Sequence, residues 1–341
     1  MYLCIQMKSK NISQYDVISA LRLPLIVLVT YAHSYGGVAE GYSLIGSGWD
    51  SYEVLKIVMS QTLVKVAMPT FFVMSGYLFF ANVEQFNKEI FCQKIRRRIK
   101  TLLLPYIIWN LLMAVKLKIF NLGIIVEPAN MPLWFLRDLM IVSLLTPIIY
   151  IVVRKFNFWI IILLLPIYLT GIRAIQPGPN PYAICFFTLG AYMSIKKINL
   201  IEVCLRLEKV AYFLTVFLAL AMILTYPTIA YSFLMLCFRV VSVMAVFCLA
   251  YRILSGTTKR IPKTVCDASY FIYLAHYVFF FSFIDTAFFS LFGTSTLSMC
   301  AHYLLCPLVK AAIFVAIYYI YRKPLGRKNR LFTSFVKRRV S

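Results

Sequence analysis

The chain has 341 residues, of which 62% are hydrophobic and 14% are charged, and its formal net charge is +23. Soluble domains carry about 25% charged residues, so this composition excludes an ordinary soluble protein. Apolar runs recur along the whole sequence, and many are long enough to cross the ~30 Å hydrocarbon core of a bilayer. Because backbone groups in lipid must form their hydrogen bonds within each helix, we predict an all-α, polytopic transmembrane helical bundle, a single domain over residues 1–341.

Hydropathy and length predict about ten spans. Their expected ranges, in chain order, are 14–33, 62–81, 99–120, 132–153, 157–173, 181–195, 210–228, 231–252, 268–291 and 299–321. Lys and Arg occur in residues 1–13, in the tail 323–341 and in the connections after the even-numbered spans, whereas the other connections hold very few. By the positive-inside rule, both termini are predicted to be cytoplasmic. The positive charge is therefore interpreted as a topology signal, and no soluble basic module suggests a nucleic-acid partner.

The first span carries Arg22 and His33 in the stretch ALRLPLIVLVTYAHS, residues 20–34. On a helix their spacing is ~3 turns and ~16 Å, so both side chains are predicted to point the same way, Arg22 in the inner half and His33 near the outer end. Taken singly, Arg22 is equally explained by snorkelling and His33 by an interfacial position. Since charges inside a membrane are costly, the pair together favours a polar cavity that crosses the bilayer.

A basic cluster precedes the third span, with Lys94, Arg97, Arg98 and Lys100 as its main members. Such clusters flank spans for topological reasons alone. Guanidinium groups also bind phosphate in a bidentate manner, so the alternative prediction is a phosphate site at the cytoplasmic membrane face.

The fourth span begins with Trp134, Arg137 and Asp138. Trp134 fits an interfacial aromatic belt. Arg137 and Asp138 are sequence neighbours, so we expect them not to face each other and each to find another partner. A carboxylate near His33 orients an imidazole in triad chemistry, which makes Asp138 a candidate for that task.

Two further histidines lie in the last two spans. His276 is predicted on the cytoplasmic side of the ninth span, with a slight preference for a functional role, and His302 is predicted to be interfacial. Lys65, Arg239, Asp285 and Lys310 also lie within or beside spans, and the sequence assigns them no role. The nine cysteines show no paired ligand spacing, so no metal is expected.

The ordered set of motifs resembles the acyltransferase 3 family, the bacterial membrane O-acyltransferases that modify cell-surface glycans. The motifs are Arg22 with His33, Pro69-Thr-Phe-Phe followed by Ser75-Gly-Tyr, Arg97-Arg98 ahead of Pro105-Tyr106, Leu133-Trp-Phe-Leu, and Ile272-Tyr-Leu-Ala-His276. One position departs from the family pattern. Many members have a further arginine three residues after the first of the basic pair, whereas here Lys100 stands three residues after Arg97. A lysine keeps the charge but loses the bidentate fork.

The resemblance implies a transferase of the bacterial cytoplasmic (inner) membrane that takes an acyl group, commonly acetyl, from cytoplasmic acyl-coenzyme A. The acceptor would be a hydroxyl of a surface polysaccharide or lipid-linked sugar. His33 would act as general base or transient acyl carrier, with Arg22 and Asp138 as further catalytic candidates. The expected donor-binding residues are Lys94, Arg97, Arg98 and Lys100, and the expected substrate-binding residues are Trp134, Arg137 and His276. The alternative from another class is a polytopic transporter or glycan exporter, in which the same charges form a substrate or proton path.

Overall fold

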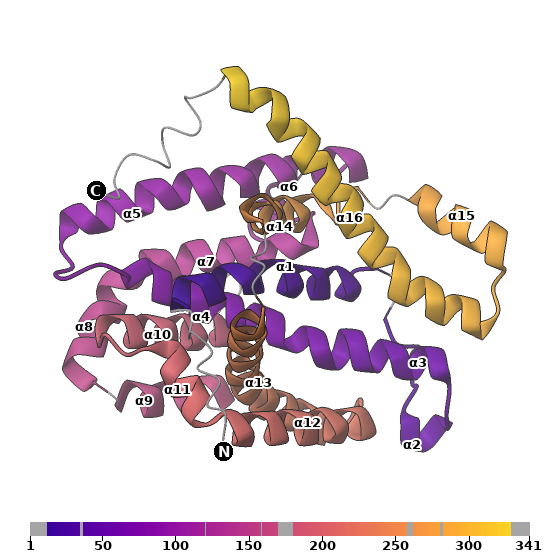
Figure 1. Ribbon diagram of the computed structural model, residues 1–341, viewed down its shortest axis with the longest axis horizontal. Coiled ribbons are helices and arrows are strands. Elements are labelled where there is room, and N and C mark those ends of the chain that lie inside the picture. The colour runs from indigo at the N-terminus through magenta and orange to yellow at the C-terminus, as the bar shows by residue number, and fades with distance from the viewer. Residues whose placement is uncertain are drawn as a thin grey trace, which may run out of the picture.

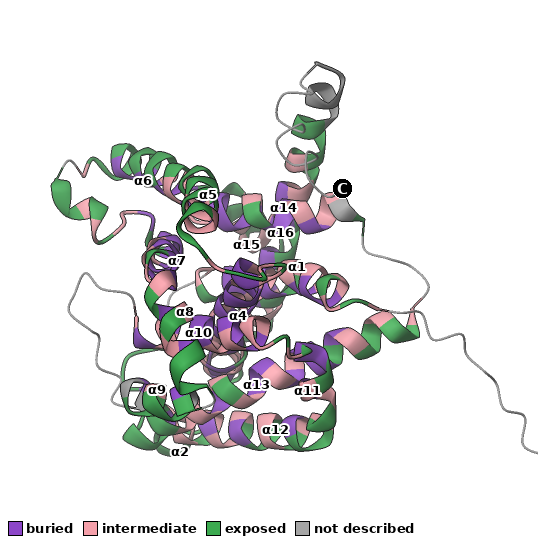
Figure 2. Ribbon diagram, turned by 90° about the vertical axis from the view of Figure 1, so that its left-hand side faces the viewer, coloured by how far each residue is buried: buried purple, intermediate pink, exposed green. Residues whose placement is uncertain are grey.

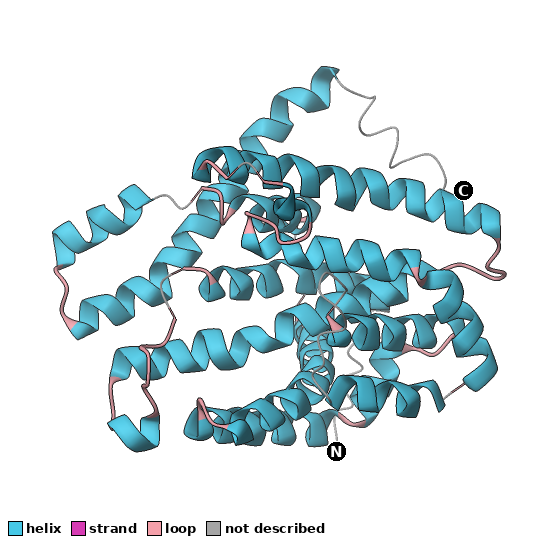
Figure 3. Ribbon diagram, turned by 180° about the vertical axis from the view of Figure 1, so that it is seen from behind, coloured by secondary structure: helices cyan, strands magenta, loops and turns pink. Residues whose placement is uncertain are grey.

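The computed structural model describes residues 12–34, 37–119, 121–157, 159–169, 180–257, 262–279 and 282–328. Within these ranges every regular element is a helix and there is no strand, which confirms the predicted all-α class (Figures 1 and 3). The helices are α1 (Gln14–Ala32), α2 (Leu44–Ser47), α3 (Ser51–Lys56), η1 (Ile57–Thr62), η2 (Leu63–Val66), α4 (Ala67–Phe80), α5 (Lys88–Arg98), η3 (Ile99–Leu103), α6 (Leu104–Leu117), η4 (Leu122–Ile125), η5 (Met131–Leu133), α7 (Trp134–Leu144), α8 (Thr146–Phe156), α9 (Trp159–Leu169), α10 (Pro181–Ile195), α11 (Leu200–Arg206), α12 (Glu208–Thr225), α13 (Ile229–Gly256), α14 (Lys263–Ala275), α15 (Ser282–Phe292) and α16 (Thr296–Lys328).

Six helical segments of the described chain are long and apolar enough to cross a membrane. They are Gln14–Ala32, Ser51–Phe80, Lys88–Leu117, Glu208–Thr225, Ile229–Gly256 and Thr296–Arg322. Two bent helix pairs raise the number to eight when each pair counts as one span. The predicted figure of about ten therefore stays a prediction, as does the side of the membrane on which the termini lie.

The second predicted span is longer and less regular than its hydropathy suggests. It starts at Ser51 and continues as one helical segment to Phe80, through the π-helical η1 and the 3-10 helix η2. A change of winding inside a helix commonly marks strain or a functional position. Here it occurs around Lys65, which lies in η2.

The fourth predicted span is bent, by 60° between η5–α7 and α8. Pro147, in the first turn of α8, has no N–H to continue the helix from Ser143. The Ser143 carbonyl instead accepts a hydrogen bond from the Thr146 hydroxyl at 2.7 Å. The bend is thus a consequence of one proline, with the freed carbonyl satisfied locally.

The ninth predicted span, 268–291, is not one helix. α14 ends at Ala275 and α15 begins at Ser282, and the segment between them contains the run Tyr277-Val-Phe-Phe-Phe. Aromatic and β-branched side chains lose rotamer freedom in a helix, which disfavours its continuation here. The Lys116 ammonium donates to the Val278 carbonyl in the break at 2.7 Å, so the interruption is stabilised from α6.

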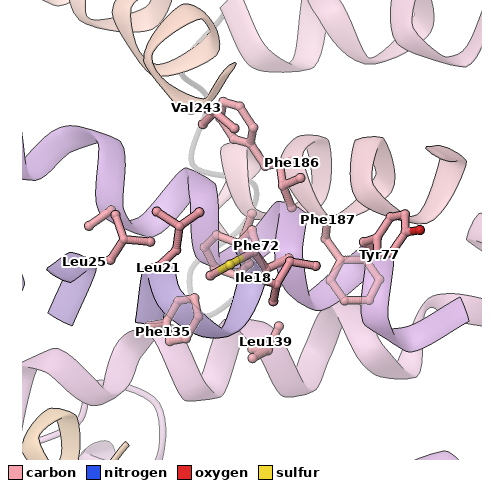
Figure 4. Packing of buried hydrophobic residues seen from close by; sticks show 14 of the residues in the cluster. Ile18, Leu21, Leu25, Phe72, Tyr77, Phe135, Leu139, Phe186, Phe187 and Val243 are labelled. Atoms are coloured by element: carbon pink, nitrogen blue, oxygen red, sulfur yellow. The ribbon is translucent and has the colours of Figure 1, made fainter. Parts of the chain in front are cut away.

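The core is centred on α4, which is surrounded by α1, α7, α10 and α13. Side chains from these five helices meet around Phe72, including Ile18, Phe135, Phe187 and Val243 (Figure 4). Helix α4 is largely buried, whereas α6 is mainly exposed and α12 exposes one part of its surface (Figure 2). The exposed positions on these outer helices are mostly apolar, such as Leu111, Leu112 and Val115 on α6 and Phe213, Val216, Phe217 and Leu220 on α12. A surface of this kind is suited to lipid rather than water.

Helices α4 and α10 approach closely because each presents a glycine to the other. A Cβ placed on Gly76 would lie 2.0 Å from the Phe187 carbonyl oxygen, and one on Gly190 would lie 2.0 Å from the Val73 carbonyl oxygen. Small residues at a helix crossing allow backbone contact of this kind in membranes. Tyr77, of the Ser75-Gly-Tyr motif, is buried beside this contact.

Candidate functional site

The candidate site lies where α1, α14 and α16 contact one another. α1 begins with Ser13 as N-cap, in a capping box with Asp16, and ends with His33 as C-cap. Arg22 lies near Cys266 toward the start of α14, and His33 lies beside His276 just after the end of α14. Both residues of the Arg22–His33 motif therefore lie toward α14, in agreement with the shared face that their spacing predicted.

The two histidines are direct neighbours. The ring centroids of His33 and His276 are 5.5 Å apart, and the Tyr277 ring stands edge-on to His33, also at 5.5 Å. His33, Ser34 and His276 line a small pocket whose opposite wall is formed by Lys310 and Phe314 of α16. Two imidazoles, a hydroxyl and an ammonium thus meet at one concave position inside an otherwise apolar bundle.

His276 has a fixed hydrogen-bonding state. Its Nδ1 lies 2.9 Å from the Tyr273 carbonyl oxygen and 3.1 Å from that of Ile272, so Nδ1 carries the proton and caps the last turn of α14. Its Nε2 is therefore an acceptor, and this buried atom has no hydrogen-bond partner among the described residues. A buried acceptor without a partner is costly and is commonly found at functional sites.

The predicted levels of His276, on the cytoplasmic side, and of His33, near the outer end, do not fit together, because the two rings are neighbours. α14 begins at Lys263 and ends at Ala275, so His276 stands at the far end of its helix instead of near the start of a long span. This shift brings it level with the end of α1. The break after α14 is what unites the two histidines.

The residues of the basic cluster lie on two different faces of the helical segment formed by α5 and η3. Arg98 turns inward: its guanidinium donates to the Ser75 hydroxyl at 2.9 Å and lies 5.0 Å from the Phe79 ring centroid. Lys94, one turn earlier, lies 5.3 Å from the same ring centroid. Arg97 and Lys100 are exposed. The four predicted phosphate-binding residues are therefore not one set, because positions four apart share a helix face that packs on α4.

Arg137 and Asp138 do pair, contrary to the expectation from their adjacency. Arg137 Nε donates to Asp138 Oδ1 at 2.9 Å, and the long Arg137 side chain also reaches the Val126 carbonyl. The other Asp138 oxygen accepts from the Asn180 backbone N–H, also at 2.9 Å. No contact between Asp138 and His33 occurs in the described structure, so the candidate role of Asp138 in orienting that histidine is not supported by its position.

Trp134 lies against protein rather than in an open aromatic belt. Its ring centroid is 5.9 Å from that of Tyr182, which it meets edge-on, and 6.5 Å from that of Phe72. The guanidinium of Arg239, in α13, lies over the Tyr182 ring at 4.8 Å from its centroid. Trp134 is thus part of a group of aromatic and cationic side chains that also contains Tyr182 and Arg239.

A further polar cluster, between α15 and α16, was not predicted. Asp285 accepts from Lys310 at 2.9 Å and pairs with His302 at 3.1 Å, and the Cys306 thiol lies in the same group. His302 is buried against Phe288 and Phe289, and its predicted interfacial level stays a prediction. Positions 302, 306 and 310 recur at four-residue spacing, a signal that was available in the sequence once α16 is taken as one helix. The network holds Lys310, whose ammonium borders the histidine pocket.

Comparison with known proteins gives two matches. A family model described as an acyltransferase domain, acyltransferase 3, matches residues 15–321. The succinoglycan biosynthesis protein ExoH of Rhizobium meliloti (strain 1021) is 26% identical over 176 residues, which cover 43% of this chain and 45% of that protein. The match therefore spans less than half the length of that relative. No solved structure matches the chain.

Proposed function

The chain belongs to the acyltransferase 3 family, and on that premise we propose that it transfers an acyl group from cytoplasmic acyl-coenzyme A to a hydroxyl of a surface polysaccharide or lipid-linked sugar. Acetyl is the simplest acyl group that this donor supplies. The similarity to a protein named for succinoglycan biosynthesis supports a polysaccharide acceptor.

The observation that carries the proposal is the meeting of His33 and His276 at one pocket. A neutral imidazole has a lone pair that can accept the proton of an alcohol. The membrane interior around the pocket excludes bulk water, which limits hydrolysis of the thioester.

In the proposed reaction the acceptor hydroxyl oxygen attacks the thioester carbonyl carbon while His33 removes the hydroxyl proton. The new C–O ester bond forms, the C–S bond breaks, and the proton passes from the imidazolium to the leaving coenzyme A thiolate. Because the thioester is already activated, the protein mainly aligns the two substrates and holds the proton. The alternative, in which His33 carries the acyl group for a time, uses the same residue and the same pocket.

His276 acts in this scheme as a positioning residue. Its Nε2 is an acceptor because its Nδ1 donates to α14 carbonyls. An N–H of His33 directed at this Nε2 would place the lone pair of the other His33 nitrogen toward the acceptor. This is the geometric task that a carboxylate performs in catalytic triads.

Donor binding is assigned to the cytoplasmic end of the bundle. Arg97 and Lys100 are exposed there and suit the phosphates of coenzyme A, whereas the guanidinium of Arg98 is occupied by Ser75 and packs on Phe79. Arg22 lies between this end and His33 on α1, at the level at which the thioester arm would enter. In the described structure Arg22 makes no hydrogen bond or ion pair, so its donors remain open to a ligand.

We place the protein in the bacterial inner membrane with both termini in the cytoplasm and about ten crossings, counting α9 and the broken α14–α15 segment. The alternation of basic connections supports this orientation. The exposed basic residues of α5 then lie on the side where coenzyme A is available.

The experiment is a comparison of surface polysaccharide from a gene-deletion strain complemented with the wild-type chain or with His33→Ala. Mass spectrometry should find acyl substituents only with the wild type, at equal polymer yield and equal protein level. Loss of polymer in the deletion strain would indicate export, and acyl substituents at the wild-type level with His33→Ala would remove His33 from the reaction.

A further inference from the structure

Two cations that the proposed reaction does not use, Lys65 and Arg239, lie in the interior of the bundle. Lys65 is in η2, midway along the helical segment Ser51–Phe80, and Arg239 is in α13. α13 packs against η2, and the Tyr231 hydroxyl of α13 donates to the Gln61 carbonyl of the adjoining η1 at 2.8 Å. Both cations are partly buried and within electrostatic reach of each other.

Among the described residues, no carboxylate forms an ion pair with Lys65 or Arg239. The ion pairs of the described residues use other cations, namely Lys56, Arg137, Arg206, Arg252, His302, Lys310 and Arg322. Two like charges held close together away from water disfavour each other and are costly to desolvate. An anionic ligand between them would relieve both penalties.

Buried hydroxyls without partners lie one turn from each cation. Thr62 precedes Lys65 and is fully buried, and Ser242 follows Arg239 and is 1% exposed. Neither hydroxyl has a hydrogen-bond partner among the described residues. Residues three apart on a helix are neighbours, so each hydroxyl adds a donor next to a cation, as anion sites require.

The two cations also connect the aromatic group to the histidine pocket. The Arg239 guanidinium lies 4.8 Å from the Tyr182 ring centroid, and Tyr182 meets Trp134 edge-on. At the other end, Lys65 lies within electrostatic reach of His33, and α1 packs against η2. The order along this line is Trp134, Tyr182, Arg239, Lys65 and His33.

We infer that Lys65 and Arg239 bind an anionic group of the acceptor, a carboxylate or a phosphate on the saccharide, and hold it beside His33. The inference rests on the proposed function for its choice of a saccharide acceptor. Aromatic rings next to the cations suit the apolar face of a sugar, which favours the acceptor over coenzyme A, whose phosphates are assigned to the distant Arg97 and Lys100. The acceptor is thus an acidic glycan or a sugar attached to phosphate.

The test measures binding to purified wild-type protein in lipid nanodiscs, with no acyl donor present. The probes are methyl glucuronide, glucose 1-phosphate, neutral methyl glucoside and coenzyme A, and the readouts are the thermal unfolding midpoint and tryptophan fluorescence. We expect one or both anionic sugars to bind at least tenfold more tightly than methyl glucoside, and the stronger of the two identifies carboxylate or phosphate as the ligand.

The variants are Lys65→Gln, Arg239→Gln and the double variant, with Arg154→Gln as an exposed arginine control. Each of the first three should lose at least tenfold in anionic-sugar affinity, while the control keeps it. The unliganded Lys65→Gln protein should unfold at a temperature no lower than wild type, because a charge repulsion has been removed. This second readout shows that the variant is folded.

Equal binding of the anionic and neutral sugars overturns the inference, as does anionic-sugar binding that the Lys65 and Arg239 variants leave unchanged. Coenzyme A binding that is lost in the same variants also overturns it, since the site would then belong to the donor. Failure of the proposed acyl transfer has a different signature, namely a wild-type protein that binds acidic sugar but acylates none.

Discussion

The imidazole rings of His33 and His276 lie 5.5 Å apart between centroids, with their planes tilted by 48°, although they come from opposite ends of the sequence. Each histidine stands at the C-terminal end of its helix, and the Nδ1 proton of His276 is committed to the carbonyls of α14. The remaining nitrogen of His276 is the buried acceptor that gives this pair its proposed chemistry.

Replacement of His276 by Asn should separate its two roles. An asparagine amide presents a donor close to the position of Nδ1, so α14 keeps its cap, but the acceptor at Nε2 is lost. We expect kcat to fall on the order of 10²-fold, as misalignment of a reacting group does. The KM for acyl-coenzyme A should stay unchanged. His276→Gln, which retains a group near Nε2, should recover part of kcat, whereas a purely structural residue would show equal losses in both variants.

The matched control for this experiment is His302→Gln, which keeps a donor toward Asp285. Its kcat should remain close to that of wild type, because His302 does not line the histidine pocket and the glutamine keeps Asp285 paired. A kcat loss in His302→Gln as large as that in His276→Asn would indicate that the α15–α16 cluster takes part in the reaction.

Arg97→Gln and Arg98→Gln should give different results although the residues are adjacent. Arg98 holds α5 to α4 through Ser75 and Phe79, so its loss should lower the thermal unfolding midpoint. Arg97 is exposed, and its loss should leave stability unchanged while raising the KM for acyl-coenzyme A roughly tenfold, the equivalent of one charge-assisted hydrogen bond. Thermal unfolding and steady-state kinetics on both proteins check this, and a reversed assignment of the two effects would contradict it.

Asp138→Ala should destabilise the protein by about 3–5 kcal/mol, because it leaves Arg137 without its buried partner. The double variant Arg137→Met with Asp138→Leu should unfold at a higher temperature than Asp138→Ala alone. Activity per folded molecule should persist in the double variant. Complete loss of turnover with normal stability would instead return Asp138 to the catalytic residues.

Gly76→Ala and Gly190→Ala should each destabilise the α4–α10 contact, since the added methyl group meets a backbone carbonyl. Overpacking of this kind costs about 1–3 kcal/mol. Gly256→Ala is the control, because a Cβ there meets no atom within 4 Å. Thermal unfolding should give Gly256→Ala the same midpoint as wild type and the other two variants a lower one. An unchanged midpoint for Gly190→Ala would show that α4 and α10 separate more readily than their contact indicates.

Hydropathy was sufficient to predict the helical class and the positions of several helices, since α1, α10, α12 and α13 start and end near the expected residues. It did not predict the bend at Pro147 or the break after α14, because a hydrophobicity average does not register one missing N–H or a run of poor helix formers. The break after α14 has the largest consequence for the site, because it places His276 at the end of a helix and beside His33.

Local spacing predicted that Arg22 and His33 share a face, but not which helix they face. The expectation that Arg137 and Asp138 would not pair was wrong, because a long arginine side chain can fold back onto the residue next to it. The pairing of His33 with His276 and of Lys65 with Arg239 depends on contacts between distant segments, which one sequence alone does not specify.

The most direct measurement of the central claim is acyl transfer from labelled acetyl-coenzyme A to purified glycan acceptor by the protein in lipid nanodiscs. Wild type, His33→Ala and His33→Gln are compared, with unfolding midpoint and coenzyme A binding as controls. We predict that both variants fold and bind coenzyme A normally while transfer falls by roughly 10²–10⁴-fold, the contribution of a general base. Near-normal transfer by His33→Ala would contradict the account.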